Sequence, residues 1–124
     1  MIAIDTSSLI AYLRGEEGSD VESVDDVFRL QQAVLPPVVL TEILSDPKLD
    51  RAVAGLIRGI PLLEIHEGYW ERAATVRAKI LSQGLRARLA DTLIAQSCLD
   101  HKTPLITRDS DFRHFAKHGA LVLV

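Results

Sequence analysis

The sequence predicts an α/β fold, a three-layer α/β/α sandwich around a mainly parallel central sheet. Short apolar segments with strand character alternate along the chain with longer segments of helical periodicity. The chain has 124 residues, which is the length of one domain, so we expect a single domain over residues 1–124. Its 48% hydrophobic and 25% charged residues exclude a disordered, collagen-like or coiled-coil protein.

The first half of the chain begins with an apolar strand over residues 1–5, which a carboxylate closes. Hydroxyl side chains at 6–8 can cap a helix that runs to about residue 14, and a second helix opens at Ser19 or Asp20. Pro36 and Pro37 are expected to break that second helix. The elements expected next are a strand at 38–40, a helical turn capped by Thr41, a helix at 48–58 and a strand at 62–65.

The second half carries the clearest helical pattern. Tyr69, Ala73, Val76 and Ile80 recur at helical spacing and predict a helix over residues 67–83, which Gly84 terminates. This stripe also predicts that Tyr69 and Trp70 pack in the core. Thereafter we expect a basic loop, a helix at 89–102, a strand at 104–107, a short helix at 111–117 and a last strand at 120–124.

Charge is unevenly distributed along the sequence. Residues 1–65 have a net charge of −6 and residues 66–124 a net charge of +3. The overall charge of −3 argues against a purely electrostatic nucleic-acid binder. A bound divalent cation weakens that objection, because it inverts the local field.

No apolar run is long enough to span a membrane, and no basic, signal-like segment opens the chain. The single cysteine, Cys98, cannot form an internal disulfide. Together these features predict a cytoplasmic protein without a membrane partner.

Carboxylates follow several of the predicted strands. In open parallel sheets, ligands bind beyond the carboxyl ends of the strands. Five acids from four separate regions are expected near this rim: Asp5, Glu42, Asp91, Asp109 and Asp111. Each acid taken alone is also compatible with a helix-start or turn residue, but together they predict a site for Mg²⁺ or Mn²⁺. Zinc-ligand spacing, a glycine-rich phosphate loop and a serine nucleophile elbow are all absent.

Four segments that carry these acids resemble the acidic motifs of PIN-domain nucleases, and most closely those of the VapC-type toxins. They are Ile4-Asp5-Thr6-Ser7, Leu40-Thr41-Glu42, Ala90-Asp91-Thr92-Leu93-Ile94-Ala95 and Leu105-Ile106-Thr107-Arg108-Asp109-Ser110-Asp111-Phe112. The resemblance covers almost the whole chain in order and spacing. It implies a Mg²⁺- or Mn²⁺-dependent endoribonuclease in which Asp5, Glu42, Asp91 and Asp109 are catalytic metal ligands and Asp111 is an additional or alternative ligand.

Neighbouring polar residues are expected to support these acids. Thr6 or Ser7 can orient Asp5 or a phosphate oxygen, and the candidate phosphate contacts are Arg86, Arg88 and Arg108. The resemblance further implies an RNA substrate, a VapB-like antitoxin partner and a homodimer. Apolar surface on the second helix and on the 67–83 helix favours such contacts.

Two other functions are compatible with parts of this pattern. One is a PIN-like module that binds RNA or protein without catalysis, which a metal-dependent cleavage assay distinguishes. The other is a phospho-acceptor signalling domain. It is disfavoured because it requires paired acids after the first strand and a lysine after the last, whereas Asp5 stands alone and no lysine follows Lys117.

Overall fold

The computed structural model describes residues 1–124. Three short strands form a parallel sheet in the order β2-β1-β3: β1 (Ile2–Ile4), β2 (Ala33–Val34) and β3 (Leu105–Ile106). The seven helices are α1 (Thr6–Leu13), α2 (Ser19–Arg29), α3 (Pro37–Leu44), α4 (Arg51–Arg58), α5 (Tyr69–Ser82), α6 (Leu89–Asp100) and α7 (Phe112–Gly119). The predicted α/β/α sandwich with a parallel sheet is confirmed.

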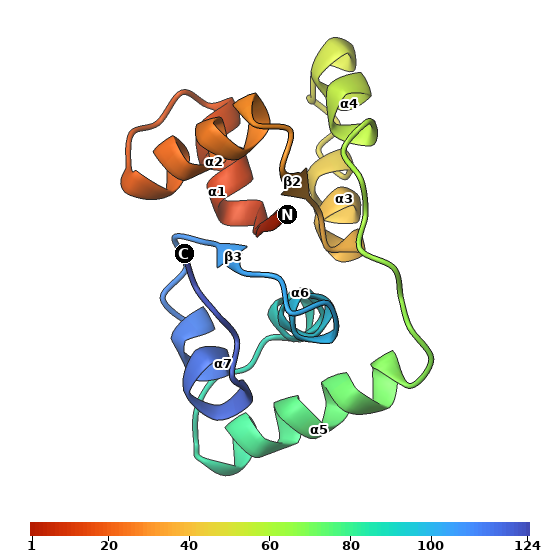
Figure 1. Ribbon diagram of the computed structural model, residues 1–124, viewed down its shortest axis with the longest axis vertical. Coiled ribbons are helices and arrows are strands. Elements are labelled where there is room, and N and C mark those ends of the chain that lie inside the picture. Colours follow the sequence, from red (N-terminus) through yellow and green to blue (C-terminus); the bar gives the residue numbers. More distant parts are fainter.

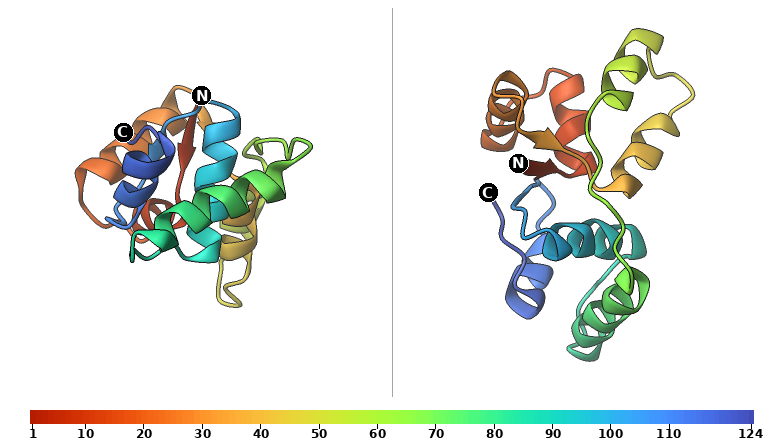
Figure 2. Two further views of the ribbon diagram at one scale, coloured as in Figure 1. Left: turned by 90° about the horizontal axis from the view of Figure 1, so that it is seen from below. Right: turned by 45° about the vertical axis from the view of Figure 1, so that its right-hand side comes forward.

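The layers bring segments from both halves of the sequence to the sheet. Helices α1 and α2 lie on one side of it, and α6 and α7 lie on the other (Figure 1). Helix α5 packs outside α6 and α7, and α4 projects from the edge beyond α3, as Figure 2 shows. Fully buried side chains such as Ile4, Leu105 and Phe112 fill the core between these layers. None of the helices is both long enough and apolar enough to cross a membrane.

The strand predicted at 38–40 is wrong. The apolar run that begins at Ala33 is divided between β2 and α3, with Pro36 and Pro37 at the start of α3. A proline at the first helical position loses no hydrogen bond and has the φ angle that a helix needs. The two prolines therefore begin a helix, and Thr41 and Glu42 lie inside it instead of following a strand.

Two further strands that the sequence predicted are reduced to single bridges. Residues 62–65 contribute only the Leu35–Leu62 bridge, and residues 120–124 contribute only the Leu105–Leu123 bridge. The helix expected at 48–58 begins instead at Arg51, because the Asp50 side chain accepts hydrogen bonds from the amides of Ala52 and Val53. These differences lie at the margins of the sheet and leave its three central strands intact.

The helices predicted in the second half are present as α5, α6 and α7; α5 and α6 are slightly shorter than predicted, and α7 ends two residues later. Tyr69 is buried, and its hydroxyl donates a hydrogen bond to the Leu93 carbonyl oxygen of α6 at 2.6 Å. Trp70 is 62% exposed, so the prediction that it packs in the core is wrong. It lies one position away from the stripe that faces α6, with its ring edge-on to Tyr69.

Candidate carboxylate centre at the end of the sheet

Asp5 directly follows β1 and is the most buried acid of the chain. The residue is 3% exposed, and its backbone amide donates to the Ile106 carbonyl oxygen, which keeps it in register with β3. Two hydroxyl groups donate to its Oδ2 atom, that of Ser7 at 2.6 Å and that of Thr107 at 2.8 Å. Burial raises the pKa of Asp5 above its ordinary value in spite of these hydrogen bonds.

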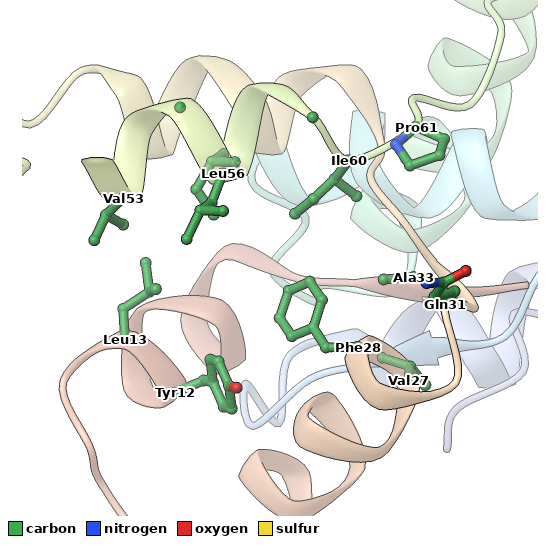
Figure 3. Close-up of a pocket in the computed structure, with 13 residues that line it drawn as sticks. Tyr12, Leu13, Val27, Phe28, Gln31, Ala33, Val53, Leu56, Ile60 and Pro61 are labelled. Carbon is green, nitrogen blue, oxygen red and sulfur yellow. The ribbon is translucent and has the colours of Figure 1, made fainter. Parts of the chain in front are cut away.

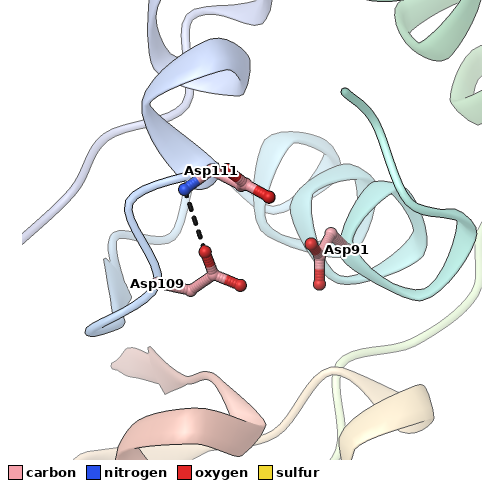
Figure 4. A group of neighbouring side chains, drawn as sticks. All are labelled: Asp91, Asp109 and Asp111. Atoms are coloured by element: carbon pink, nitrogen blue, oxygen red, sulfur yellow. Dashed lines mark hydrogen bonds between the residues drawn. The ribbon is translucent and has the colours of Figure 1, made fainter. Parts of the chain in front are cut away.

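The segment that follows β3 is a chain of side-chain to backbone hydrogen bonds. The Asp109 amide donates to the Thr107 hydroxyl oxygen at 3.0 Å, and the Asp111 amide donates to Oδ1 of Asp109 at 2.9 Å (Figure 4). Hydroxyl and carboxylate side chains commonly close turns by bonding to amides two residues further along. Thr107 thereby connects this turn to Asp5, a role that the sequence analysis did not assign to it. The sequence signal for this role is that Thr107 stands two residues before Asp109.

Asp91 lies in the first turn of α6, as predicted, and faces the turn at 109–111. Oxygen atoms of Asp91, Asp109 and Asp111 lie within 4.8 Å of one another, and their side chains converge in Figure 4. The Oδ2 atom of Asp91 is buried and has no hydrogen-bond partner. A buried carboxylate oxygen without a hydrogen-bond partner is costly, and it is the kind of oxygen that a bound cation would satisfy.

The electrostatics of Asp91 connect it to the other acids. Its pKa is raised from 3.8 to about 6, mainly by burial and then by the negative charges of Asp109, Asp5 and Glu42. The cation of Arg88 opposes this rise without cancelling it. The acids predicted from four separate regions of the sequence therefore act on one another in the folded protein.

Glu42 reaches the same region from α3. Its side chain is exposed, and its Oε1 atom accepts a hydrogen bond of 2.6 Å from the hydroxyl of Thr6. The two hydroxyl residues after Asp5 thus have different partners, since Ser7 holds Asp5 and Thr6 holds Glu42. Both contacts orient a carboxylate; that of Ser7 with Asp5 was expected, whereas that of Thr6 with Glu42 was not.

The three candidate arginines differ in their surroundings. The Nη1 atom of Arg86 lies 3.8 Å from Oδ2 of Asp111, and Arg88 acts on the charge of Asp91. Both side chains are exposed and can reach an anion beside the carboxylates. Arg108 instead donates two hydrogen bonds to Asp20, at 2.8 and 3.1 Å, and one to Glu16 at 3.3 Å. Its guanidinium is directed to α2 and to the loop before it.

The donor set fits a divalent cation. All the converging ligand atoms are carboxylate oxygens, which Mg²⁺ and Mn²⁺ prefer, and no histidine or cysteine is among them. A cation also supplies the positive group that the unpartnered Asp91 oxygen lacks. Asp91, Asp109 and Asp111 converge there, and the charges of Asp5 and Glu42 act on Asp91.

Fold and site together define a small α/β domain with a carboxylate centre at the carboxyl edge of a parallel sheet. The family model of the PIN domain matches residues 2–118, and the chain belongs to the PIN domain family. A comparison with curated protein sequences gives no significant match.

Several solved structures are similar over the whole chain. VapBC2 from Rickettsia felis, bound to a DNA fragment from its promoter, is 16% identical with a TM-score of 0.73, and covers 100% of this chain and 98% of its own. FitAcB from Neisseria gonorrhoeae is 19% identical with a TM-score of 0.71, at 99% and 96% coverage. VapBC-5 from Mycobacterium tuberculosis, a member of the VapBC toxin–antitoxin family, is 17% identical with a TM-score of 0.68, again at 99% and 96%. At these identities the likeness establishes the fold.

Proposed function

We propose that this protein is a Mg²⁺- or Mn²⁺-dependent endoribonuclease and the toxin of a toxin–antitoxin pair. The observation that carries the proposal is the buried, unpartnered oxygen of Asp91, whose pKa is raised to about 6 by burial and then by the neighbouring carboxylates. Such an arrangement costs stability unless a cation neutralises it, and costly groups are retained at functional sites. Membership of the PIN domain family, whose members are generally nucleases, agrees with it.

In this mechanism Asp5, Glu42, Asp91 and Asp109 would hold the cation, with Asp111 beside them. Its chemistry, when bound, would be to lower the pKa of a water molecule and to neutralise charge on the phosphodiester. The hydroxyls of Ser7 and Thr107 hold Asp5 in place, and that of Thr6 holds Glu42. Arg86 and Arg88 contact the phosphate backbone, which lets RNA approach a negatively charged site.

The experiment is an RNA cleavage assay with purified protein in Mg²⁺, in Mn²⁺ and in EDTA. Cleavage that requires the metal and disappears in Asp91→Asn supports the proposal. Cleavage of equal rate in EDTA contradicts the metal mechanism. Absence of cleavage under every condition favours the alternative, a PIN-like module that binds RNA or protein without catalysis. A cytoplasmic location follows from the proposed RNA substrate.

An apolar groove offers a docking surface for the antitoxin. It lies between the α1–α2 pair and α4, has a volume of about 720 Å³ and is lined mainly by aliphatic and aromatic side chains (Figure 3). Phe28 and Leu56 face each other across it, and Leu56 is 75% exposed. Exposed apolar surface of this kind marks a site for a partner protein.

We assign this groove to the apolar face of an antitoxin segment, because its lining is mainly aliphatic and aromatic and includes no charged side chain. The similar solved structures VapBC2 and VapBC-5 belong to toxin–antitoxin pairs, which supports an antitoxin as the partner. Such an antitoxin inhibits most simply by placing an arginine or an acidic residue in the carboxylate cluster. Loss of antitoxin binding in Leu56→Asp tests the groove, with Leu81→Asp on α5 as the exposed control.

We also propose that the protein forms a homodimer. The apolar stripe of α5 packs on α6 and α7 and is not available, so the exposed apolar residues elsewhere must supply the interface. Light scattering at high protein concentration measures the oligomeric state, and a purely monomeric mass contradicts the dimer.

A further inference from the structure

Arg108 lies between two residues of the carboxylate centre, yet its side chain is directed to another part of the molecule. Thr107 bonds to Asp5, and Asp109 belongs to the acidic cluster. The guanidinium of Arg108 donates from Nε and Nη2 to the two carboxylate oxygens of Asp20, at 2.8 and 3.1 Å. Such paired, charge-assisted hydrogen bonds fix orientation as well as distance.

Asp20 is in turn bound to other parts of the same half of the molecule. Its Oδ2 atom accepts a hydrogen bond of 2.8 Å from Ser8, which is completely buried in α1. Arg108 also donates to the Glu17 carbonyl oxygen at 3.1 Å and to the Glu16 side chain at 3.3 Å. The segment after β3 is thus fastened to α1, to the first turn of α2 and to the loop between them.

The loop before α2 leaves room for this ion pair. Gly18 has a φ angle of +149°, and a Cβ atom placed there would lie 2.5 Å from Oδ1 of Asp20 and 3.0 Å from Nη2 of Arg108. Another residue at this position would be strained by the φ angle and would crowd the ends of both side chains. Gly18 therefore lets the backbone run close to the Arg108–Asp20 pair.

We propose that Arg108 is a positioning residue for the carboxylate centre, and that its pairing with Asp20 holds Thr107 and Asp109 in the geometry that a cation needs. This reassigns Arg108 from the phosphate contact expected from the sequence. The inference rests on the proposed function, since it concerns how the same centre is kept ready for a metal. Arg108 acts through its neighbours and touches neither metal nor substrate.

The test compares Arg108→Ala with the wild type and with Arg29→Ala. Arg29 is a matched control because it forms ion pairs with Asp25 and Asp26 on the surface of α2, away from residues 107–111. Amide hydrogen exchange of the metal-free proteins is measured first. In Arg108→Ala the amides of Asp109 and Asp111 should exchange about tenfold faster, because the turn that protects them opens locally.

Mn²⁺ affinity is measured next by calorimetry, without RNA. Arg108→Ala should bind Mn²⁺ about tenfold more weakly, the loss that removal of an outer contact of a metal site commonly causes. Arg108→Lys should recover part of the affinity, because an ammonium restores the charge without the paired geometry. Gly18→Ala should weaken Mn²⁺ binding through displacement of the same pair. When Arg108→Ala is added to Asp20→Asn, the further loss of Mn²⁺ affinity should be small, because both changes break the same contact.

These outcomes separate the positioning role from a merely stabilising one. If Arg108→Ala lowers the melting temperature but leaves both local exchange and Mn²⁺ affinity unchanged, the positioning role is overturned. Faster exchange with unchanged Mn²⁺ affinity overturns it too. If the wild-type protein binds Mn²⁺ but cleaves no RNA, the nuclease proposal fails while the metal data still decide the role of Arg108. If the wild type binds no Mn²⁺, the metal site fails and the positioning role of Arg108 is overturned with it.

Discussion

Asp20 and Asp91 are both in the first turn of a helix, but the structure gives them opposite environments. Asp20 has Arg108 and Ser8 as partners, and the hydrogen bonds from Arg108 are the main reason that its pKa is lowered to about 2. Asp91 has one buried oxygen without a partner, and burial together with three nearby acids raises its pKa to about 6. An acid whose charge is balanced within the fold serves the structure, whereas an unbalanced one requires a ligand from outside.

The raised pKa of Asp91 and the lowered pKa of Asp20 make the stability of the fold depend on pH in opposite directions. The folded-state pKa of Asp91 lies above its ordinary value of 3.8, so the folded protein holds a proton there that the unfolded chain releases. Stability contributed by that proton is present below pH 4 and is lost as the pH rises through about 6. The lowered pKa of Asp20 acts in the opposite sense, because its contribution is present above pH 4 and is lost as the pH falls towards 2.

The largest expected effect is on RNA cleavage, in variants of the carboxylate centre to which Asp91 belongs. Single changes to alanine at Asp5, Glu42, Asp91 or Asp109 should each reduce RNA cleavage to background, because each removes a proposed metal ligand. Cleavage is followed with end-labelled RNA in Mn²⁺. Asp111→Ala should be milder than Asp109→Ala, and the reverse order would show that Asp111 is the main fourth acid. Full activity of any of the four variants contradicts the shared site.

The second effect concerns the metal itself. At about a hundred times its Kd, Mn²⁺ should stabilise the wild-type protein by roughly 2.7 kcal/mol, because it binds the folded state. Thermal melts in EDTA and in Mn²⁺ measure this stabilisation. Asp91→Asn should respond less than the wild type, since it has lost a ligand. Equal stabilisation of both proteins would place the cation away from Asp91.

The acids predicted from the sequence lie in the expected part of the fold, whereas one of the elements that carry them differs from its prediction. Asp5 and Asp91 occupy the predicted positions at the end of β1 and in the first turn of α6. Glu42 is on a helix, as predicted, but this helix begins at Pro37 where a strand was expected, because a strand and a helix start both suit an apolar segment after two prolines. Glu42 therefore reaches the carboxylate centre because of its position in the chain, whether a strand or a helix precedes it.

The contacts that sequence reasoning missed are the long-range ones. Neither the bond between Thr107 and Asp5 nor that between Arg108 and Asp20 has a local pattern, since the partners are separated by 102 and 88 residues. An arginine beside an acidic motif is compatible with a phosphate contact or with an ion pair. Only the folded arrangement, which brings the loop before α2 next to the end of β3, distinguishes the two.

A third, smaller effect concerns Asp20, whose charge is balanced by Arg108. Asp20→Asn should lower the melting temperature of the metal-free protein at pH 7 by roughly 3–5 °C, because it weakens the charge-assisted pair with Arg108. The difference from the wild type should shrink as the pH is lowered from 4 to 2, where the wild-type carboxylate itself becomes protonated. Circular dichroism melts over this range provide the measurement. A variant as stable as the wild type at pH 7 would show that solvent already screens the pair.

The smallest effect is a gain in stability at Asp91, opposite in sign to the loss expected at Asp20. Asp91→Asn should stabilise the metal-free protein at pH 7 by about 1 kcal/mol, because it removes a partly buried charge that other acids repel. The gain should disappear near pH 4, since the wild-type side chain is then neutral in the folded protein as well. Denaturant unfolding in EDTA at pH 4, 6 and 7 measures the trend. If Asp91→Asn is instead less stable than the wild type at pH 7, the carboxylate stabilises the start of α6 as an ordinary helix-end acid, and the contrast with Asp20 is removed.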